Sequence, residues 1–216
     1  MKSVLIIGMG KFGHHLCEGM AKLGNELMIV DSSEDAVEDL ASLVTSVRIG
    51  DCTNVEVLRS LGVSNFDLCV VCIGSNFQNS LEITSLLKEL GAKYVISKAN
   101  RDIHAKFLLR NGADEVIYPN RDIAKRLAVR LSANHLFDYI QLTDEYAIYE
   151  IPVMREWIGK SIRDINFRAK YKVNILGIKQ IGKTNFLPEA DYEFEGEEHL
   201  MILGLKEDVN RILKAL

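Results

Sequence analysis

The sequence lacks a long hydrophobic run, a basic block and a secretory leader. None of its 216 residues belongs to an apolar stretch of 18, and the chain begins directly with strand-like residues. We therefore expect neither a membrane span nor a signal peptide, and a cytosolic protein. Basic side chains number 26 against 30 acidic ones, which gives a formal net charge of −4. That balance argues against a general nucleic-acid or anionic-membrane surface.

Cysteine is sparse, with four residues in a chain that shows no leader: Cys17, Cys52, Cys69 and Cys72. We expect free thiols in such a chain. Cys69 and Cys72 form a C-x-x-C, the spacing of some metal and redox sites. They lie inside a strand-like run, however, where residues i and i+3 point to opposite faces. We therefore interpret both as core residues.

Hydrophobic residues make up 48% of the chain, enough for a packed core. Over the first two-thirds, short β-branched runs alternate with amphipathic segments, a rhythm typical of βαβ units around a parallel sheet. Strands are predicted at 3–8, 26–31, 46–50, 67–73, 94–98 and 115–118, with helices at 11–23, 33–43, 54–61, 76–90, 102–111 and 121–134. The fold class is α/β: a Rossmann-type, doubly wound parallel sheet with a second, smaller α+β domain. Domains are expected at 1–135 and 140–216.

The second domain is predicted from three further strands, at 146–153, 173–179 and 199–205, and from two short helices at 161–168 and 208–216. This unit of roughly 75 residues is smaller than the substrate domain of a typical dehydrogenase.

A G-x-G-x-x-G loop follows the first strand at residues 8–13 and opens into a helical pattern. Gly8 would allow the tight turn, Gly10 would let a phosphate approach the backbone, and Gly13 would let the helix pack close to the sheet. The second strand ends in Asp31, near the spacing at which an acid reaches an adenosine ribose hydroxyl. The alternative for Asp31 is an N-cap of the next segment.

Polar residues also follow the later strands, as Gly50-Asp51-Cys52-Thr53, Gly74-Ser75-Asn76, Lys98-Ala99-Asn100 and Pro119-Asn120-Arg121-Asp122. In a doubly wound sheet these ends rim one crevice, where ligands bind. The alternative interpretation is turn and cap chemistry, with Thr53 and Ser75 as helix N-caps.

Catalytic signatures are weak. Tyr94 and Lys98 have the Y-x-x-x-K spacing, but they fall on a predicted strand, where they stand roughly 13 Å apart. The histidines form no metal pattern, since His14 and His15 are adjacent and neighbouring helical side chains diverge. No Ser-His-Asp or Cys-His arrangement stands out. We therefore favour binding without chemistry, with no catalytic and no metal-ligating residue assigned. The alternatives are an NAD-dependent oxidoreductase and a stand-alone NAD(H) redox sensor.

Nearly the whole chain resembles the RCK (also called KTN) regulatory proteins of bacterial potassium uptake, of the KtrA/TrkA type. The resemblance is carried by residues 4–13, Val30-Asp31, Gly50-Asp51-Cys52-Thr53, Ile73-Gly74, and residues 111–119, 142–146 and 166–171. It implies a non-catalytic homodimer that assembles into an octameric ring. Such a ring binds ATP or ADP, in some members NAD(H), and docks on the cytoplasmic face of a potassium-translocating membrane subunit of the KtrB/TrkH type. It also implies no nucleic-acid partner, no direct membrane insertion, and in several members cyclic di-AMP on the second domain.

The resemblance also implies residue roles. The glycines would cradle the phosphates, Asp31 would accept from the ribose, and Asp51, Cys52 and Thr53 would flank the adenine. The residues expected to bind nucleotide are Gly8, Gly10, Lys11, Phe12, Gly13, Asp31, Ser32, Asp51, Cys52, Thr53, Ile73, Gly74, Ser75 and Lys98.

Two positions depart from the family pattern. Lys11 stands where relatives often have an Arg that reaches the terminal phosphate in the neighbouring subunit; Lys keeps the charge but loses the bidentate fork. Asn120 stands where relatives often have a Glu near a divalent cation, so a Mg²⁺ site should be weakened. For cyclic di-AMP the resemblance points to residues 173–178 and Pro188, with Asn174 as a polar contact and Ile162, Ile165 and Ile175 against the purines. Ordinary dimer packing is the alternative there.

Overall fold

The computed structural model describes residues 1–132 and 136–215. Within them the chain divides into two compact units, Met1–Arg121 and Asp122–Leu216. The expected domain end at residue 135, and His135 itself, lie outside the described residues. No helix in the described ranges is both long enough and apolar enough to pass through a membrane.

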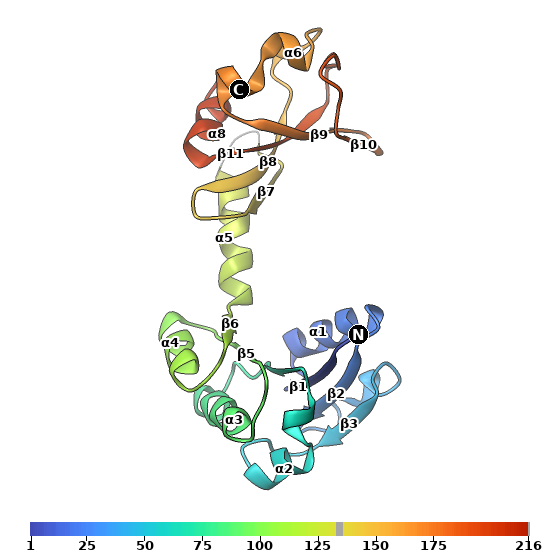
Figure 1. Ribbon diagram of the computed structural model, residues 1–216, viewed down its shortest axis with the longest axis vertical. Coiled ribbons are helices and arrows are strands. Elements are labelled where there is room, and N and C mark those ends of the chain that lie inside the picture. The colour runs from blue at the N-terminus through green and yellow to red at the C-terminus, as the bar shows by residue number, and fades with distance from the viewer. Residues whose placement is uncertain (133–135, 216) are drawn as a thin grey trace. The chain divides into compact units, whose positions relative to one another are not determined.

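The first unit is built on a six-stranded parallel sheet in the order β3-β2-β1-β4-β5-β6 (Figure 1). The strands are β1 (Ser3–Ile7), β2 (Glu26–Asp31), β3 (Ser46–Ile49), β4 (Leu68–Val71), β5 (Val95–Lys98) and β6 (Glu115–Ile117). The order reverses between β1 and β4, which are hydrogen-bonded neighbours. The predicted Rossmann-type sheet is confirmed.

Helices connect these strands: α1 (Lys11–Lys22), α2 (Val55–Ser60), α3 (Phe77–Glu89), α4 (Asp102–Arg110) and, after β6, α5 (Pro119–Ser132). A short 3-10 turn, η2 (Val63–Asn65), precedes β4. The predicted helix at 33–43 is wrong, because only the 3-10 turn η1 (Glu38–Leu40) forms there. Where the helix was expected to begin, Asp31 Oδ1 instead accepts a hydrogen bond from the Ser33 N–H at 3.0 Å. Such local side-chain bonds compete with helix formation.

The core of this unit lies on both faces of the sheet, so the central strands are nearly continuous apolar runs. Cys69 belongs to the cluster on one face and Cys72 to the cluster on the other. Both are buried and free. The expectation that these two thiols point to opposite faces is confirmed.

The second unit holds a five-stranded antiparallel sheet in the order β10-β9-β11-β8-β7. Its elements are β7 (Asp138–Gln141), β8 (Tyr146–Pro152), η3 (Arg155–Trp157), α6 (Ile162–Ile165), α7 (Phe167–Tyr171), β9 (Asn174–Gln180), β10 (Lys183–Phe186), β11 (His199–Leu205) and α8 (Lys206–Leu213). Three strands and the α+β character follow expectation. The expected helix at 161–168 is divided, because Asn166 takes a left-handed conformation with φ 53°.

Candidate functional site

A cavity of about 250 Å³ opens at the carboxyl ends of the strands around the reversal between β1 and β4. In open α/β sheets this is where ligands bind. Its lining comes from four strand ends and the start of α3: Ile7, Gly8, Val30, Asp31, Ser32, Gly50, Asp51, Cys52, Ile73, Ser75, Asn76, Asn79 and Ile83.

The glycine loop has a different requirement at each glycine. Gly8 has φ +94°, and a Cβ there would lie 2.8 Å from Ile73 Cγ1. A Cβ on Gly13 would collide with the carbonyl oxygen of Gly8, so only glycine lets α1 lie this close to the end of β1. Gly10, by contrast, faces open space. The protein itself does not require glycine at position 10, which leaves room for a ligand.

Helix α1 begins without local partners for its first N–H groups. Its N-cap, Gly10, provides no side-chain hydrogen bond, and the first turn holds no acidic residue. The first backbone bond of this turn runs from His14 N–H to Gly10 O at 3.0 Å. The positive end of the helix dipole and its unpaired donors favour an anion at this position.

Asp31 ties the glycine loop to the end of β2. Its Oδ2 accepts from the Met9 N–H at 2.7 Å, and its Oδ1 accepts from the Ser33 N–H at 3.0 Å. A carboxylate has about four acceptor positions, so it keeps capacity for a ligand hydroxyl. Asp31 thus forms a local turn with Ser33 and lines the cavity, but it caps no helix, because the next element is the 3-10 turn η1 with Val37 as its N-cap.

Asp51 and Cys52 follow β3 and line the cavity differently. The Thr53 N–H and hydroxyl donate to Asp51 Oδ1 at 2.9 and 2.8 Å, and these bonds lower the pKa of that carboxyl. Cys52 is buried, and burial together with the carboxylates of Asp51 and Asp31 raises its pKa to about 12. Its thiol therefore stays protonated and unreactive at neutral pH.

The N-caps lie one residue later than expected. Asn54, not Thr53, caps α2 by accepting from the Glu56 N–H at 2.9 Å. Asn76, not Ser75, caps α3 by accepting from the Asn79 N–H at 3.1 Å. Thr53 instead orients Asp51, and Ser75 lines the cavity.

The structure separates the expected site residues into two groups. Seven line the cavity: Gly8, Asp31, Ser32, Asp51, Cys52, Ile73 and Ser75. The other seven are not among its lining residues: Gly10, Lys11, Phe12, Gly13, Thr53, Gly74 and Lys98. Lys98 and Phe12 nevertheless come together, with the Lys98 Nζ 5.5 Å from the centre of the Phe12 ring. Asn79 also lines the cavity and was not among the expected residues. Its position in the first turn of α3, just after a strand end, could have indicated this.

Two residue pairs carry side chains of the kinds used in catalysis: Tyr94 with Lys98, and Ser80 with His104. Tyr94 immediately precedes β5 and Lys98 ends it, so the two residues are separated by the length of a strand, as expected. Ser80 Oγ lies 2.6 Å from His104 Nε2, but the two residues are 0% and 2% exposed. Burial and the nearby Arg101 cation lower the pKa of His104. This pair connects α3 to α4 inside the core and is closed to a substrate.

A cavity of about 520 Å³ lies in the second unit. Ile162, Ile175 and Pro188, expected there, line it; Ile165 and Asn174 do not. The complete lining is Ile162, Arg163, Asn166, Phe167, Arg168, Val173, Ile175, Pro188 and Ala190. The two arginines, which the sequence did not indicate, bring cationic groups to a wall that is apolar except for Asn166. Arg163 Nε also contacts Asp191 Oδ1 at 2.7 Å.

Comparison with known proteins identifies both halves. Residues 4–119 match the TrkA-N domain family, and residues 146–216 match the TrkA-C domain family. Ktr system potassium uptake protein C of Bacillus subtilis is 37% identical over 99% of this chain and 96% of its own length. Protein A of the same system and organism is 38% identical, over 97% and 95%. A solved structure described as the GsuK channel bound to NAD has a TM-score of 0.68 at 19% identity, over 96% of this chain and 38% of that one.

Proposed function

The chain belongs to the TrkA family, with a TrkA-N domain followed by a TrkA-C domain, and we propose from this that it is the nucleotide-responsive regulatory subunit of a membrane potassium transporter. The supporting observation is the cavity at the strand reversal. There Gly8 of the glycine loop and the carboxylate of Asp31 line one opening, and the loop leads directly into the uncapped start of α1. These are the two features that recognise the phosphates and the ribose of an adenine nucleotide.

The proposed ligand is ATP or ADP, with NAD(H) as the alternative. Asp31 would accept a ribose hydroxyl while it keeps the Met9 N–H, and the phosphates would lie at the start of α1. Asp51 and Cys52 would lie beside the base. A nucleotide dissociation constant from calorimetry tests this, with ATP, ADP, AMP, NAD⁺ and NADH compared.

Asp31→Asn provides the decisive variant, since it removes the charge and keeps one acceptor oxygen for the loop. We expect at least a tenfold loss of nucleotide affinity. Asp67→Asn is the matched control, because Asp67 also accepts a hydrogen bond from a backbone N–H, that of Ser3 at 3.1 Å, but lies before β4 at the amino ends of the strands, away from the cavity. Equal affinities of the two variants and the unaltered chain would refute the proposed site.

Lys11 is exposed and does not line the cavity of its own chain. We propose that it contacts the terminal phosphate bound in a neighbouring subunit, so that ATP and ADP favour different arrangements of the assembly. A ligand shifts such an equilibrium only by its difference in affinity for the two states. Lys11→Ala should bring the ATP and ADP affinities together, whereas Lys22→Ala, at the other end of α1, should not. Calorimetry showing an undiminished ATP preference in Lys11→Ala would contradict this role.

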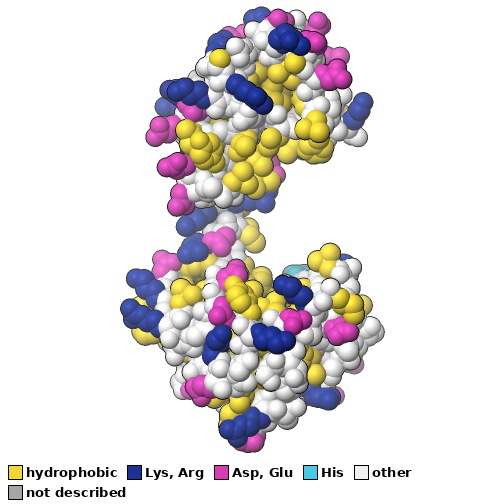
Figure 2. Space-filling model, in the orientation of Figure 1, with side chains coloured by type: hydrophobic (Ala, Val, Ile, Leu, Met, Phe, Trp, Pro, Cys, Tyr) yellow, Lys and Arg dark blue, Asp and Glu magenta, His cyan; other side chains and the backbone are white. Residues whose placement is uncertain are grey.

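The proposed assembly is a homodimer that forms an octameric ring. Helix α5 supports it, because this helix has no buried residue and exposes Ile123, Leu127 and Leu131 at a spacing of four. Hydrophobic side chains also gather on the face of the second unit drawn in Figure 2. Leu127→Glu should lower the mass measured by light scattering, and Lys125→Glu on the same helix should not. An unchanged mass in Leu127→Glu would exclude this surface from the assembly.

Docking on a KtrB/TrkH-type subunit at the inner face of the membrane completes the proposal. Potassium flux into proteoliposomes that contain such a subunit should depend on the added chain and on which nucleotide it carries. Turnover of NAD(H) with carbonyl or alcohol substrates would instead favour the oxidoreductase. Nucleotide binding without any effect on flux would favour the stand-alone sensor.

The second cavity is the proposed site for cyclic di-AMP. Its apolar wall suits purines, and Arg163 and Arg168 suit phosphates. Arg168→Ala should weaken cyclic di-AMP binding at least tenfold, with Arg155→Ala in η3 as the control. Retained affinity in Arg168→Ala would argue for ordinary packing there. Asn120 is exposed at the second position of α5, and we propose that its neutral amide leaves Mg²⁺ weakly held.

A further inference from the structure

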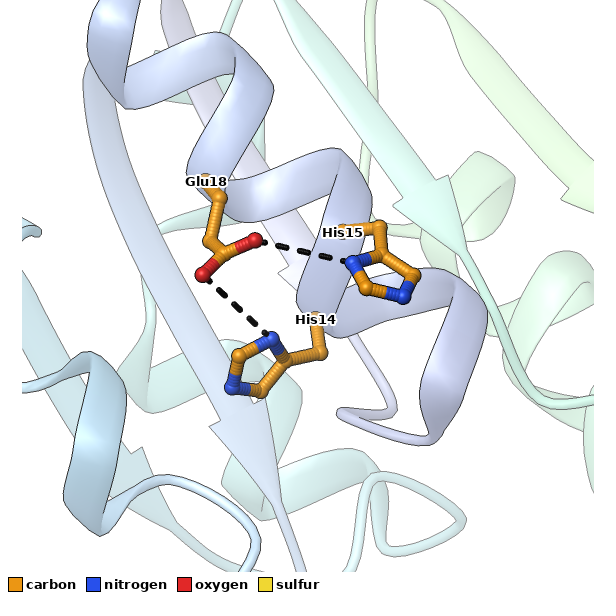
Figure 3. A group of neighbouring side chains, drawn as sticks. All are labelled: His14, His15 and Glu18. Carbon is orange, nitrogen blue, oxygen red and sulfur yellow. Dashed lines mark ion pairs between the residues drawn. The ribbon is translucent and has the colours of Figure 1, made fainter.

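Two histidines and one glutamate converge on the surface of α1 (Figure 3). The Nδ1 of His14 lies 4.0 Å from one carboxylate oxygen of Glu18, and the Nδ1 of His15 lies 3.5 Å from the other. One ligand atom from each residue lies within 4.8 Å of the other two. The expected divergence of His14 and His15 does not isolate them, because both rings turn toward the same acid.

We propose that His14, His15 and Glu18 form a binding site for a divalent transition-metal ion, with Zn²⁺ as its representative. Two imidazole nitrogens and one carboxylate oxygen are a donor set that suits zinc, with the fourth position left to solvent. Bonds of about 2.0–2.2 Å in tetrahedral geometry place ligand atoms about 3.3–3.6 Å apart. The imidazole–carboxylate separations of 3.5 and 4.0 Å run to different oxygens of Glu18, and the three ligand atoms lie within 4.8 Å of one another, so side-chain rotations would bring them to this spacing.

The surroundings leave this group available. The side chain of His15 is 80% exposed, so an ion can enter directly from water. Another histidine–glutamate pair, His199 and Glu150, is 2.9 Å apart, but the ammonium of Lys179 lies 3.1 Å from the same carboxylate. That pair offers one imidazole and a neighbouring cation, which opposes a metal ion. Among the residues that the structure describes, the α1 group is the one in which three such ligands come together.

The site would also strengthen a helix with few local determinants. Gly13 and Gly19 both lie within α1, and glycine disfavours a helix relative to alanine. The helix also starts without a side-chain cap. An ion held by residues 14, 15 and 18 ties the segment between these glycines across one turn. Metal binding should therefore raise the unfolding temperature, because it favours the folded state.

Calorimetric titration of Zn²⁺ into the full, chelator-treated chain tests the proposal. We expect one equivalent per chain with a micromolar or tighter dissociation constant, and no such binding of Mg²⁺, which prefers oxygen ligands. His14→Gln, His15→Gln and Glu18→Gln should each weaken Zn²⁺ at least tenfold, and the double histidine variant should lose the site. His199→Gln is the matched control and should bind as the unaltered chain does. Glutamine favours helices, so circular dichroism should show intact folds.

Two further readouts identify the ligands. Electron paramagnetic resonance of bound Cu²⁺ should show coupling to two imidazole nitrogens, reduced to one in either single histidine variant. Zn²⁺ should raise the unfolding temperature of the unaltered chain and not that of the double variant. Unchanged Zn²⁺ affinity and stoichiometry in the double variant would overturn the proposal, since the ion would then lie elsewhere. So would binding in the unaltered chain that requires millimolar Zn²⁺.

Discussion

Three glycines in and before α1 should respond differently to the same change, replacement by alanine. A Cβ on Gly13 would collide with the carbonyl oxygen of Gly8, a backbone atom that cannot rotate away. Overpacking of this kind costs about 1–3 kcal/mol. A Cβ on Gly19 meets no atom within 4 Å, and alanine favours a helix by about 0.5–1 kcal/mol over glycine. Gly13→Ala should therefore destabilise the chain, and Gly19→Ala should stabilise it.

Gly10→Ala separates folding from binding. Gly10 has φ −65°, which alanine adopts freely, and its Cβ would meet open space. We expect little change in the stability of the ligand-free chain. The added methyl group would occupy the approach that the proposed phosphate needs, so nucleotide affinity should fall at least tenfold. Gly19→Ala, two turns further along the helix, should leave that affinity unchanged.

Thermal unfolding followed by circular dichroism measures the first effect, and calorimetry with ADP measures the second. A change of 1 kcal/mol corresponds to about 2–4 °C for a chain of this size. Gly13→Ala should lower the midpoint by roughly 2–12 °C, and Gly19→Ala should raise it by roughly 1–4 °C. A Gly13→Ala protein as stable as the unaltered chain would refute the steric reasoning. Full ADP affinity in Gly10→Ala would refute the phosphate position.

Three further predictions concern ionisable groups. Burial raises the pKa of Cys52, Cys69 and Cys72 to about 12, so these thiols should resist a thiol reagent at pH 8 until denaturant is added. Because unfolded thiols ionise near pH 9, the urea midpoint should fall as the pH rises from about 9 toward 12. The pKa of His104 is lowered by burial and by Arg101, so its stabilising contribution is present above about pH 6.5 and is lost as the pH falls through the folded-state pKa. An NMR titration should therefore place the midpoint of this imidazole below 6.5. Thr53→Val removes one hydrogen bond to Asp51 and should raise the pKa of that carboxyl, again measured by NMR.

Much of the first unit could be predicted because its signals are local. An apolar run that ends in a glycine or a polar residue marks a buried parallel strand, as at Ile7-Gly8 and Val30-Asp31. The glycine loop and Asp31 follow from spacing along one chain segment. The opposite faces of Cys69 and Cys72 follow from the period of two in a strand. Each of these inferences needs only the residues within one βαβ unit.

The remaining features depend on residues distant in the sequence or on the choice between neighbouring polar groups. The edge strands β7 and β10 have four residues each, and pairing with β8 and β9 defines them. Asn54 and Asn76 cap α2 and α3 in place of Thr53 and Ser75, because each helix begins one residue later than expected.

Side-chain geometry decided the rest. The Lys98 ammonium lies over the ring of Phe12, although the two residues are far apart in the sequence. His14 and His15 both turn toward Glu18, although adjacent side chains on a helix are expected to diverge. From the sequence alone came the strand order and most of the helices of the first unit, three strands of the second unit, and the glycine loop beside an acid. Only the tertiary structure decided which side chains share a cavity or an ion pair, because such contacts depend on how the packed elements orient each side chain.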